Sequence, residues 1–549
     1  MPMRSPPLAR WRPLHGFIPP WLNFGLIVLI LIGIGLHGYR LGYKLYWHDE
    51  VFTSLRAAGY QAADIGEALF RDQIFTPGDL LVYQSLKPDS GPADTVQSLA
   101  LEDPQHPPLY FVLTRWWMRL LGESVVSTRS LSVAFSLLTL PVMYGLSLEL
   151  FASPLAARLS LLLLAVSPFD ILFAQLARQY SLLTLLIVLS SWLLLRMRRS
   201  NRPLWFRWGA YVLASTAGLY TQPFFGLTLF AHGSYVLSRQ CLMVPSRLGW
   251  GHEASQQPRS PIGSYLTAIV VITLLFAPWA WVIVSNFEQV QETTSWSQGF
   301  PGWEVSTKLW MLSVTALFFD LNIDFESWLI YVIRVPYLVL IGYGFWAVSR
   351  HARPESNALI QTSFWVPFLL LAGSDWVLGT HRSIVSRYLV PCFPAIQLAV
   401  GYALASAYNR VGKRLWGILL TLLLSGSLAS ILVSAHTVTW WNRVPSVFNA
   451  AVASEVNALP NPLLVSDDGG GDTMNLAELM SIARLLNDDV KLLILASDST
   501  VALETVEQIA DVVYFRPSPA LRLRTNQLLN GPLEPIEETA ATLWKLSEP

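Results

Sequence analysis

The chain has 549 residues, of which 53% are hydrophobic and only 13% are charged, and it contains 22 tryptophans. A soluble protein could not bury this much apolar surface, whereas a bilayer solvates it, so the composition predicts a polytopic membrane protein. The 37 basic and 37 acidic residues cancel, so no overall positive field indicates nucleic-acid binding. The two cysteines, Cys241 and Cys392, are too far apart for a ligand motif, and we interpret them as structural.

The N-terminal tail, residues 1–21, carries arginines and no acid, as the first region of a signal peptide does. The apolar run that follows, 22–38, ends without a small-residue cleavage site. We therefore expect an uncleaved first span with the N-terminus in the cytoplasm.

Hydropathy marks about thirteen apolar segments along the chain. They lie near 22–38, 107–121, 129–151, 155–171, 179–196, 208–222, 223–238, 264–285, 305–320, 328–348, 359–379, 384–408 and 413–435. A crossing needs about 20 apolar residues, and the segments 107–121 and 305–320 are short or interrupted. If these two are partial helices on the outer side, every cluster of Lys and Arg falls on the cytoplasmic side. The sequence thus predicts a mainly α membrane bundle of about eleven spans plus two partial helices.

In this topology residues 22–438 form the transmembrane domain, and 39–128 is a long outer loop within it. The composition changes in 439–549, where apolar runs alternate with amphipathic stretches. The expected strands are 461–468, 489–496 and 511–515, and the expected helices are 475–487 and 519–530. This order predicts a small extramembrane α/β domain on the outer side. The stretch "DDGGGD" (467–472) lacks the spacing and the Lys of a phosphate loop, so we interpret it as a turn.

The outer loop begins with "YWHDEVFTS" (46–54), in which Asp49 and Glu50 are adjacent. The pair has two interpretations. The acids could cap a helix that starts near Val51, because acids favour a helix N-terminus. Alternatively, one carboxylate could act as a general base at the membrane surface.

A second polar group lies in "LEDPQHPPLYF" (101–111). The Pro-Pro pair fits the start of a helix, because the missing N–H is not needed there, and it presents Gln105 and His106 at the helix mouth. Glu102 and Asp103 lie just upstream and could cap a helix. Together with His106 they are also candidates for a divalent metal site, although one His without regular ligand spacing is a weak signal.

Two more polar groups lie on the predicted outer side. The stretch 167–183 holds Gln175, Arg178 and Tyr180, and the stretch 379–394 holds His381, Arg382, Arg387 and Tyr388. Arginines here run against the positive-inside trend, so they are either anchors at the membrane boundary or partners of something anionic. Arg is well suited to forked contacts with phosphate. A substrate with an acyl tail, a surface phosphate and a group to transfer would fit this face.

Four motifs occur in order over roughly residues 20–435: "WHDEVFTS", "HPPLYF", "SPF…AQ-AR-YSLL" and "SRYLVPCFP". Together they resemble the integral-membrane glycosyltransferases of the GT-C class. The most similar branch is the family 39-like group, related to protein O-mannosyltransferases and lipid A aminoarabinose transferases. The resemblance implies a polyisoprenyl-phosphate-linked sugar as donor and an acceptor hydroxyl on the outer side. No motif covers 439–549.

By position, the resemblance assigns Asp49 as the catalytic base, with Glu50 as its neighbour. It places substrate- or metal-contacting side chains at Gln105 and His106, and donor-phosphate contacts at Arg178, Arg387 and Tyr388. The other candidates for substrate binding are Gln175, Tyr180 and Arg382. Many relatives read Gln-Glu-Ala-Arg where this chain has Gln-Leu-Ala-Arg at 175–178, so a metal-assisted mechanism loses an acid here.

We therefore expect an inverting glycosyltransferase that transfers a sugar from a polyisoprenyl phosphate to a hydroxyl of a lipid, glycan or protein. It would be a multi-pass protein of the plasma (inner) membrane, with the C-terminal domain extracytoplasmic and no required cofactor beyond an optional divalent metal. One alternative is a transporter or flippase of lipid-linked sugars, although matching broken helices in two halves of the chain are not evident. Another is a non-catalytic assembly protein that acts through 439–549.

Overall fold

The computed structural model describes residues 19–197, 204–247, 261–408, 410–469, 473–496, 510–529 and 531–547, together with Ser499, Val501 and Leu503. The chain divides into two compact units. We call the first the membrane unit; it consists of Met1–Tyr39, Pro104–Tyr110 and Ser132–Ser434. We call the second the α/β unit; it consists of Arg40–Asp103, Phe111–Leu131 and Ala435–Pro549.

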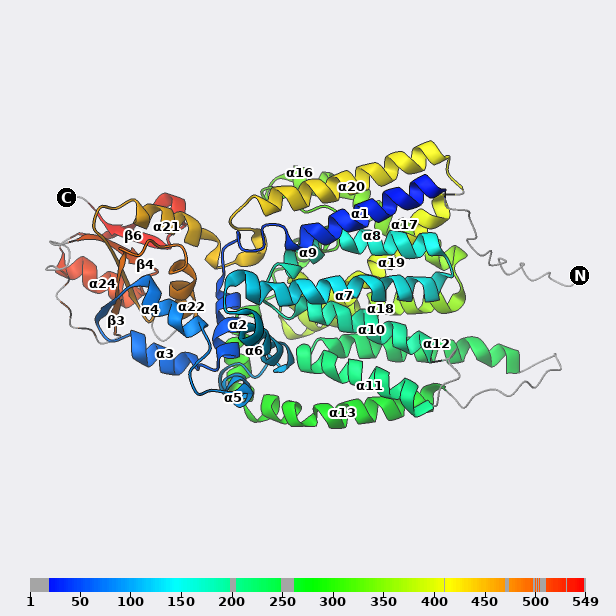
Figure 1. Ribbon diagram of the computed structural model, residues 1–549, viewed down its shortest axis with the longest axis horizontal. Coiled ribbons are helices and arrows are strands. Elements are labelled where there is room, and N and C mark those ends of the chain that lie inside the picture. The colour runs from blue at the N-terminus through cyan, green and yellow to red at the C-terminus, as the bar shows by residue number, and fades with distance from the viewer. Residues whose placement is uncertain are drawn as a thin grey trace, which may run out of the picture. The chain divides into compact units, whose positions relative to one another are not determined.

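The membrane unit is helical, and its long helices run roughly side by side (Figure 1). Its α-helices are α1 (Pro20–Gly38), α8 (Pro154–Ala165), α9 (Pro168–Ala174), α10 (Tyr180–Arg196), α11 (Leu204–Thr221), α12 (Phe225–Arg247), α13 (Pro261–Ser285), α14 (Phe287–Thr293), α15 (Trp303–Thr315), α16 (Trp328–Val332), α17 (Val335–His351), α18 (Pro354–Leu378), α19 (Phe393–Ala407) and α20 (Lys413–Ala435). Short 3₁₀ turns are η2 (Ser295–Ser297), η3 (Arg382–Ile384) and η4 (Ser386–Cys392). Two further helices contribute residues to both units, α6 (Leu109–Leu121) and α7 (Val125–Phe151).

Within the described residues, six helices are long and apolar enough to cross a membrane. They are Pro20–Gly38, Val125–Phe151, Ile262–Ser285, Trp328–His351, Ser386–Ala407 and Lys413–Ala435. The pair α8 and α9 passes the same test as one segment but bends by 54°, as a broken span or a re-entrant loop would. Apolar helices of this kind satisfy their backbone polar groups internally, which a bilayer requires.

Each of the predicted apolar segments contains a helix, which confirms the mainly helical membrane fold. The segments predicted to be partial form α6 and α15, each of 13 residues. A helix of this length rises about 20 Å, less than the roughly 30 Å of a hydrocarbon core. The number of spans, eleven, stays a prediction.

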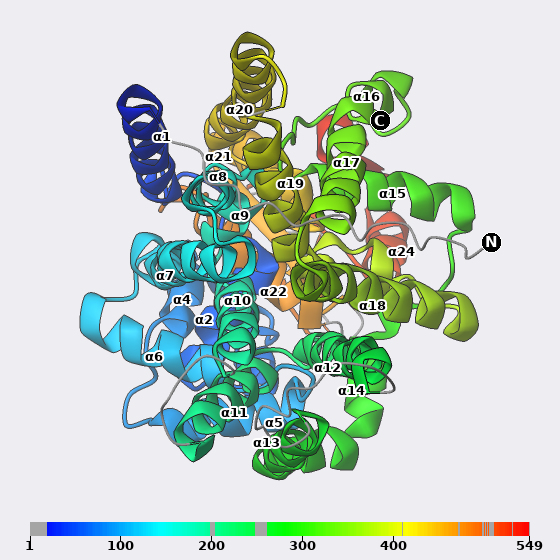
Figure 2. The ribbon, with the colours of Figure 1, turned by 90° about the vertical axis from the view of Figure 1, so that its right-hand side faces the viewer.

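Helix α19 lies inside the membrane unit, where α8, α17 and α18 surround it (Figure 2). The 18-residue apolar stretch 389–406, which includes most of α19, is entirely buried, whereas only 17% of an equally long apolar stretch of α13 is buried. Gly401 allows α19 to approach α8 closely, because a Cβ there would collide with Ser160. The two helices are therefore apolar for different reasons. Helix α19 is apolar because it packs inside the bundle, whereas α13 lies at the periphery and exposes apolar side chains, as a lipid-facing helix does.

The α/β unit combines one sheet with helices from two distant parts of the chain. From the outer-loop region come α2 (His48–Ala58), α3 (Ala62–Leu69), β1 (Gln73–Phe75), α4 (Pro77–Leu81), η1 (Val82–Gln84) and α5 (Pro92–Glu102). From the C-terminal region come η5 (Trp441–Arg443), η6 (Ser446–Phe448), α21 (Asn449–Asn457), β2 (Pro462–Asp467), α22 (Thr473–Ile482), β3 (Lys491–Leu495), β4 (Asp511–Phe515), α24 (Pro519–Leu528), β5 (Leu533–Pro535), η7 (Glu537–Thr539) and β6 (Leu543–Leu546).

The sheet has the strand order β1-β3-β2-β4-β6-β5. The three central strands are parallel, and Leu464 of β2 pairs with Leu492 of β3 and with Val513 of β4. All six residues of β2 are buried, as expected for a strand that is covered on both faces. The three predicted strands and two predicted helices are therefore confirmed. The edge strand β1 comes from the predicted outer loop and pairs antiparallel with β3.

Candidate functional site

Helix α2 starts three residues earlier than the sequence pattern suggested, at His48. Its N-cap residue is Trp47, which makes no capping hydrogen bond through its side chain. Asp49 and Glu50 therefore lie inside the first turn, and the interpretation that they cap a helix beginning at Val51 is wrong. Their charge still complements the helix dipole, but their side chains are available for other contacts.

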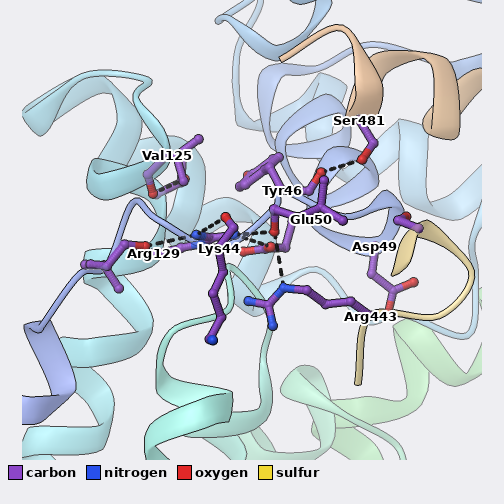
Figure 3. A network of polar contacts seen from close by, with 12 residues as sticks. Lys44, Tyr46, Asp49, Glu50, Val125, Arg129, Arg443 and Ser481 are labelled. Atoms are coloured by element: carbon purple, nitrogen blue, oxygen red, sulfur yellow. Dashed lines mark hydrogen bonds and ion pairs between the residues drawn. The ribbon is translucent and has the colours of Figure 1, made fainter. Parts of the chain in front are cut away.

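Glu50 is fully buried and forms a forked ion pair with Arg129 (Figure 3). Arg129 donates from Nε to Oε1 at 2.8 Å and from Nη2 to Oε2 at 2.7 Å. The same guanidinium donates to the backbone carbonyls of Leu41, Lys44 and Leu45, at 2.9, 2.9 and 2.8 Å. All five of its N–H groups are therefore used, which offsets the cost of burying both charges. Glu50 is a fixed part of the structure that holds the chain leading into α2.

More positive charge surrounds this pair than it needs for neutrality (Figure 3). Burial, followed by the nearby Arg443, Arg129 and Arg40, lowers the pKa of Lys44 to about 7. Burial and Arg129 also lower the pKa of Arg443 to about 9, while Glu50 acts in the opposite direction. Both Lys44 and Arg443 are almost completely buried.

Asp49 differs from its neighbour, because its side chain keeps 15% of its surface exposed. Its Oδ1 lies 3.1 Å from Nε2 of His48, and its backbone carbonyl accepts a hydrogen bond from the Thr53 hydroxyl at 2.9 Å. The carboxylate lies apart from the Glu50–Arg129 pair (Figure 3). Of the two adjacent acids, only Asp49 has a partly exposed side chain.

Glu102, Asp103 and His106, the candidate metal ligands, do not form a metal-binding group among the described residues. Glu102 pairs with Arg56 and accepts the backbone N–H groups of Ala62 and Ala63 at the start of α3, at 2.9 and 3.0 Å. Its lone pairs therefore serve the N-terminus of α3, and not that of the helix after Pro107 and Pro108, as the sequence interpretation had it. Over the described ranges, no group of three or more His, Cys, Asp or Glu side chains is arranged to hold a metal.

In the membrane unit, two of the predicted residues meet. Nη2 of Arg178 lies 3.2 Å from Nε2 of His106, which brings residues 72 positions apart into contact. The backbone around them is fixed as well: the Ser132 hydroxyl donates to the Arg178 carbonyl at 3.1 Å and contacts the Tyr110 hydroxyl at 2.7 Å. Trp279, on α13, donates to the carbonyl of Pro104 at 3.1 Å. These contacts hold the segment that carries Gln105 against α10 and α13.

The side chains of Gln175 and Tyr180 make contacts within the membrane unit that stabilise its fold. The Gln175 side-chain amide donates to the carbonyls of Leu36, His37 and Tyr39 at the end of α1, at 3.2, 3.3 and 3.0 Å. The side chain thereby joins the turn after α9 to the C-terminal end of α1. Tyr180 is buried and packs edge-on against Phe173.

The last motif lies on η3 and η4, next to the loop that follows α14. Arg387 lies over the rings of Trp296 and Tyr388, at 5.5 and 5.7 Å. Arg382 donates its backbone N–H to Asp375 at 2.9 Å and its Nε to Ser297 at 3.4 Å. Because η4 also packs against α10, this motif and the Arg178 motif border the same helix.

Three residues of these sites were not among the predicted ones: Arg129, Asp375 and Trp296. Arg129 had one visible signal, since it is an arginine at the outer end of an apolar segment, as Arg178 is. Its partner Glu50 is 79 positions away, and sequence spacing cannot connect them. The predicted residues divide between the units, with Asp49, Glu50, Glu102 and Asp103 in the α/β unit and the remainder in the membrane unit.

Comparison with known proteins agrees with the sequence motifs. Residues 105–251 match the family described as dolichyl-phosphate-mannose-protein mannosyltransferase. No curated protein matches the chain in sequence. Among solved structures, ArnT from Cupriavidus metallidurans bound to undecaprenyl phosphate is 13% identical, with a TM-score of 0.50, covering 95% of this chain and 98% of that one.

Two other solved structures are similar at lower TM-scores. Apo ArnT from the same organism is 15% identical, with a TM-score of 0.46, covering 84% of this chain and 75% of that one. The archaeal oligosaccharyltransferase AglB from Archaeoglobus fulgidus is 9% identical, with a TM-score of 0.45, covering 85% and 65%. The shared architecture confirms the fold that the four motifs predicted: the chain has the GT-C fold.

Proposed function

We propose that the chain is an inverting glycosyltransferase that transfers a sugar from a polyisoprenyl phosphate to a hydroxyl acceptor on the outer face of the membrane. The GT-C fold, the mannosyltransferase family match and the undecaprenyl phosphate named with ArnT support this class of donor. The acceptor would be a lipid, a glycan or a protein. The predicted topology supports the outer face, because it places 39–128 there with the N-terminus in the cytoplasm.

The observation that carries the proposal is the different state of the two adjacent acids. Glu50 has no exposed surface and is fixed by Arg129, whereas the Asp49 carboxylate is partly exposed at the start of the same helix. A general base must reach the proton that it removes. We therefore assign Asp49 as the base and Glu50 as the residue that holds the start of α2 in place.

The reaction needs little beyond positioning, because a lipid phosphate is already a good leaving group. Asp49 accepts the proton of the acceptor hydroxyl while the hydroxyl oxygen forms a bond to the anomeric carbon. The bond between that carbon and the phosphate oxygen breaks, and the lipid phosphate leaves with the electron pair. A single displacement of this kind inverts the anomeric configuration.

Arginines are suited to the departing phosphate, because forked N–H groups match its oxygens and the negative charge grows in the transition state. We assign this role to Arg178 and Arg387. His106 contacts Arg178 and would orient its guanidinium, and Arg387 is held over Trp296 and Tyr388. Gln105 and Arg382 remain proposed substrate contacts.

The proposal is tested with purified protein in proteoliposomes. The donors are a panel of undecaprenyl-phosphate hexoses and pentoses labelled in the sugar, and the acceptors are membrane extracts from cells that lack the gene. We expect one donor to transfer its label covalently. Asp49→Asn should lower that rate by about 10²–10⁴-fold, because a positioned general base contributes on that scale, and should leave expression unchanged.

Asp64→Asn is the matched control, since Asp64 is an exposed acid in the first turn of the next helix. Its rate should equal that of the wild type. Full activity of Asp49→Asn would overturn the assignment of the base. Movement of intact labelled lipid across the bilayer, without covalent transfer, would indicate a transporter instead.

A further inference from the structure

Glu478 is a fully buried carboxylate in α22, the helix of the C-terminal region that packs against α2. Its Oε1 accepts a hydrogen bond from the Ser446 hydroxyl at 2.6 Å, and its Oε2 accepts one from the Asn449 side-chain amide at 2.8 Å. Both donors are neutral. A glutamine could be accommodated among neutral donors without the cost of burying a charge.

The negative charge of Glu478 faces His48, the first residue of α2. Oε1 of Glu478 lies 3.7 Å from Nδ1 of His48. The backbone N–H of His48 donates to the Ser446 hydroxyl at 3.1 Å, and that hydroxyl in turn donates to Glu478. The carboxylate thus faces the ring of His48 and is linked through Ser446 to the backbone where α2 begins.

The other ring nitrogen of His48 faces Asp49. Nε2 lies 3.1 Å from Oδ1 of Asp49, so the imidazole lies between a fully buried carboxylate and a partly exposed one. The two sides of the ring are therefore distinct. The ring donates from Nε2 to Oδ1 of Asp49 and, when it also carries a hydrogen on Nδ1, directs that N–H toward Glu478.

Resting on the proposed function, we infer that His48 and Glu478 are positioning residues for the base Asp49. Glu478 holds the start of α2 through Ser446 and faces the imidazole, and the imidazole contacts Oδ1 of Asp49 and so fixes the carboxylate for the acceptor hydroxyl. A buried carboxylate that orients a histidine is a recurring arrangement in catalytic sites. The C-terminal region, which the family match does not reach, thereby takes part in catalysis through α22.

The test uses the full chain in the same proteoliposomes, with the labelled undecaprenyl-phosphate sugar that gives the highest wild-type rate. Glu478→Gln should lower kcat about 10-fold and leave KM for the donor within about twofold, because the substitution misplaces Asp49 without touching the donor. His48→Gln should lower kcat at least as much. Because Glu478 acts through His48, the double variant should be no slower than His48→Gln alone.

Asp467→Asn is the matched control. Asp467 is also a buried acid of the α/β unit, and its Oδ1 accepts the backbone N–H of Ser518 at 3.1 Å. This variant should keep the wild-type kcat, while a general weakening of the unit would lower both variants together.

Wild-type kcat in folded Glu478→Gln, or a double variant in which the two losses multiply, would overturn the inference. If Glu478→Gln does not accumulate, His48→Gln decides, because its ring is partly exposed and leaves α22 unchanged; wild-type kcat there overturns the inference equally. Failure of the proposed function is separate, since it would appear as full activity in Asp49→Asn.

Discussion

Glu50 and Glu478 lie in the same unit, and neither has any exposed surface, yet their surroundings differ. Glu50 accepts hydrogen bonds from Nε and Nη2 of the Arg129 guanidinium, and Lys44 and Arg443 lie nearby. Glu478 meets a serine, an asparagine and, at 3.7 Å, a histidine. The first carboxylate is paired with a permanently charged guanidinium, and the second faces a hydroxyl, an amide and an imidazole.

This difference separates a structural role from a positioning role. A forked pair between Arg and a carboxylate is rigid and costly to break, so it suits the anchoring of a chain segment. A histidine between two carboxylates can transmit the placement of one acid to the other. We therefore expect substitutions around Glu50 to act on stability and substitutions around Glu478 to act on rate.

The largest effect is expected from Arg129→Met. The substitution keeps a long side chain but removes the forked ion pair of Glu50, and breaking a buried ion pair costs about 3–5 kcal/mol. The measurement is the free energy of unfolding of the purified protein, followed by tryptophan fluorescence.

Arg115→Met is the control for that change. Arg115 is also buried and donates to Ala57 and Ser90, but these acceptors are carbonyl and hydroxyl oxygens. Its loss should be about 1–2 kcal/mol, because no charge is left without a partner. Equal losses for the two variants would show that the ion pair contributes nothing special.

The second prediction concerns pH and the excess positive charge near Glu50. The pKa of Lys44 is lowered from 10.5 to about 7, first by burial and then by the neighbouring arginines. Between these values the unfolded chain holds a proton that the folded chain does not, so stability rises with pH across this window. Below about pH 7 both states are protonated, and the full penalty of the buried charge is present.

Lys44→Met removes this pH dependence. The stability of the wild type relative to the variant should therefore increase as the pH rises from about 7 toward 10.5. Thermal unfolding midpoints of both proteins, measured across that range, check the trend. The exposed Lys491, at the start of β3, provides the control, because Lys491→Met should follow the wild type at every pH. A constant difference between wild type and Lys44→Met would contradict the prediction.

The sequence predicted the elements of this fold better than the contacts of its site. The strands of 461–468, 489–496 and 511–515 could be found because each is a short apolar run bounded by polar residues. The strand β1 could not be found, because it has three residues and becomes a strand only through its pairing with β3. The start of α2 was misplaced because Trp47 is not a residue that marks an N-cap.

The site shows the same limit at the level of side chains. Asp49 and Glu50 are adjacent and chemically alike, so their sequence could not show that one is buried and the other partly exposed. That difference comes from Arg129, which lies 79 positions away. Glu478 is in an amphipathic helix whose polar positions look like ordinary surface, and only its packing against α2 brings it to His48. Long-range contacts of this kind require the fold.

The smallest effects are expected from two buried serines beside Glu478. Ser446 donates to the carboxylate at 2.6 Å, and Ser481 donates to the carbonyl of Tyr46 at 2.8 Å. Ser446→Ala should lower the free energy of unfolding by about 1.5–3 kcal/mol, because hydrogen bonds to charged groups are the stronger ones, and Ser481→Ala by about 0.5–1.5 kcal/mol. Chemical denaturation of both variants measures the difference. Both expected losses lie at or below the range expected for Arg129→Met. A loss of stability above about 3 kcal/mol in Ser446→Ala would therefore contradict the distinction between the two carboxylates. It would show that Glu478 has a structural role, as Glu50 has.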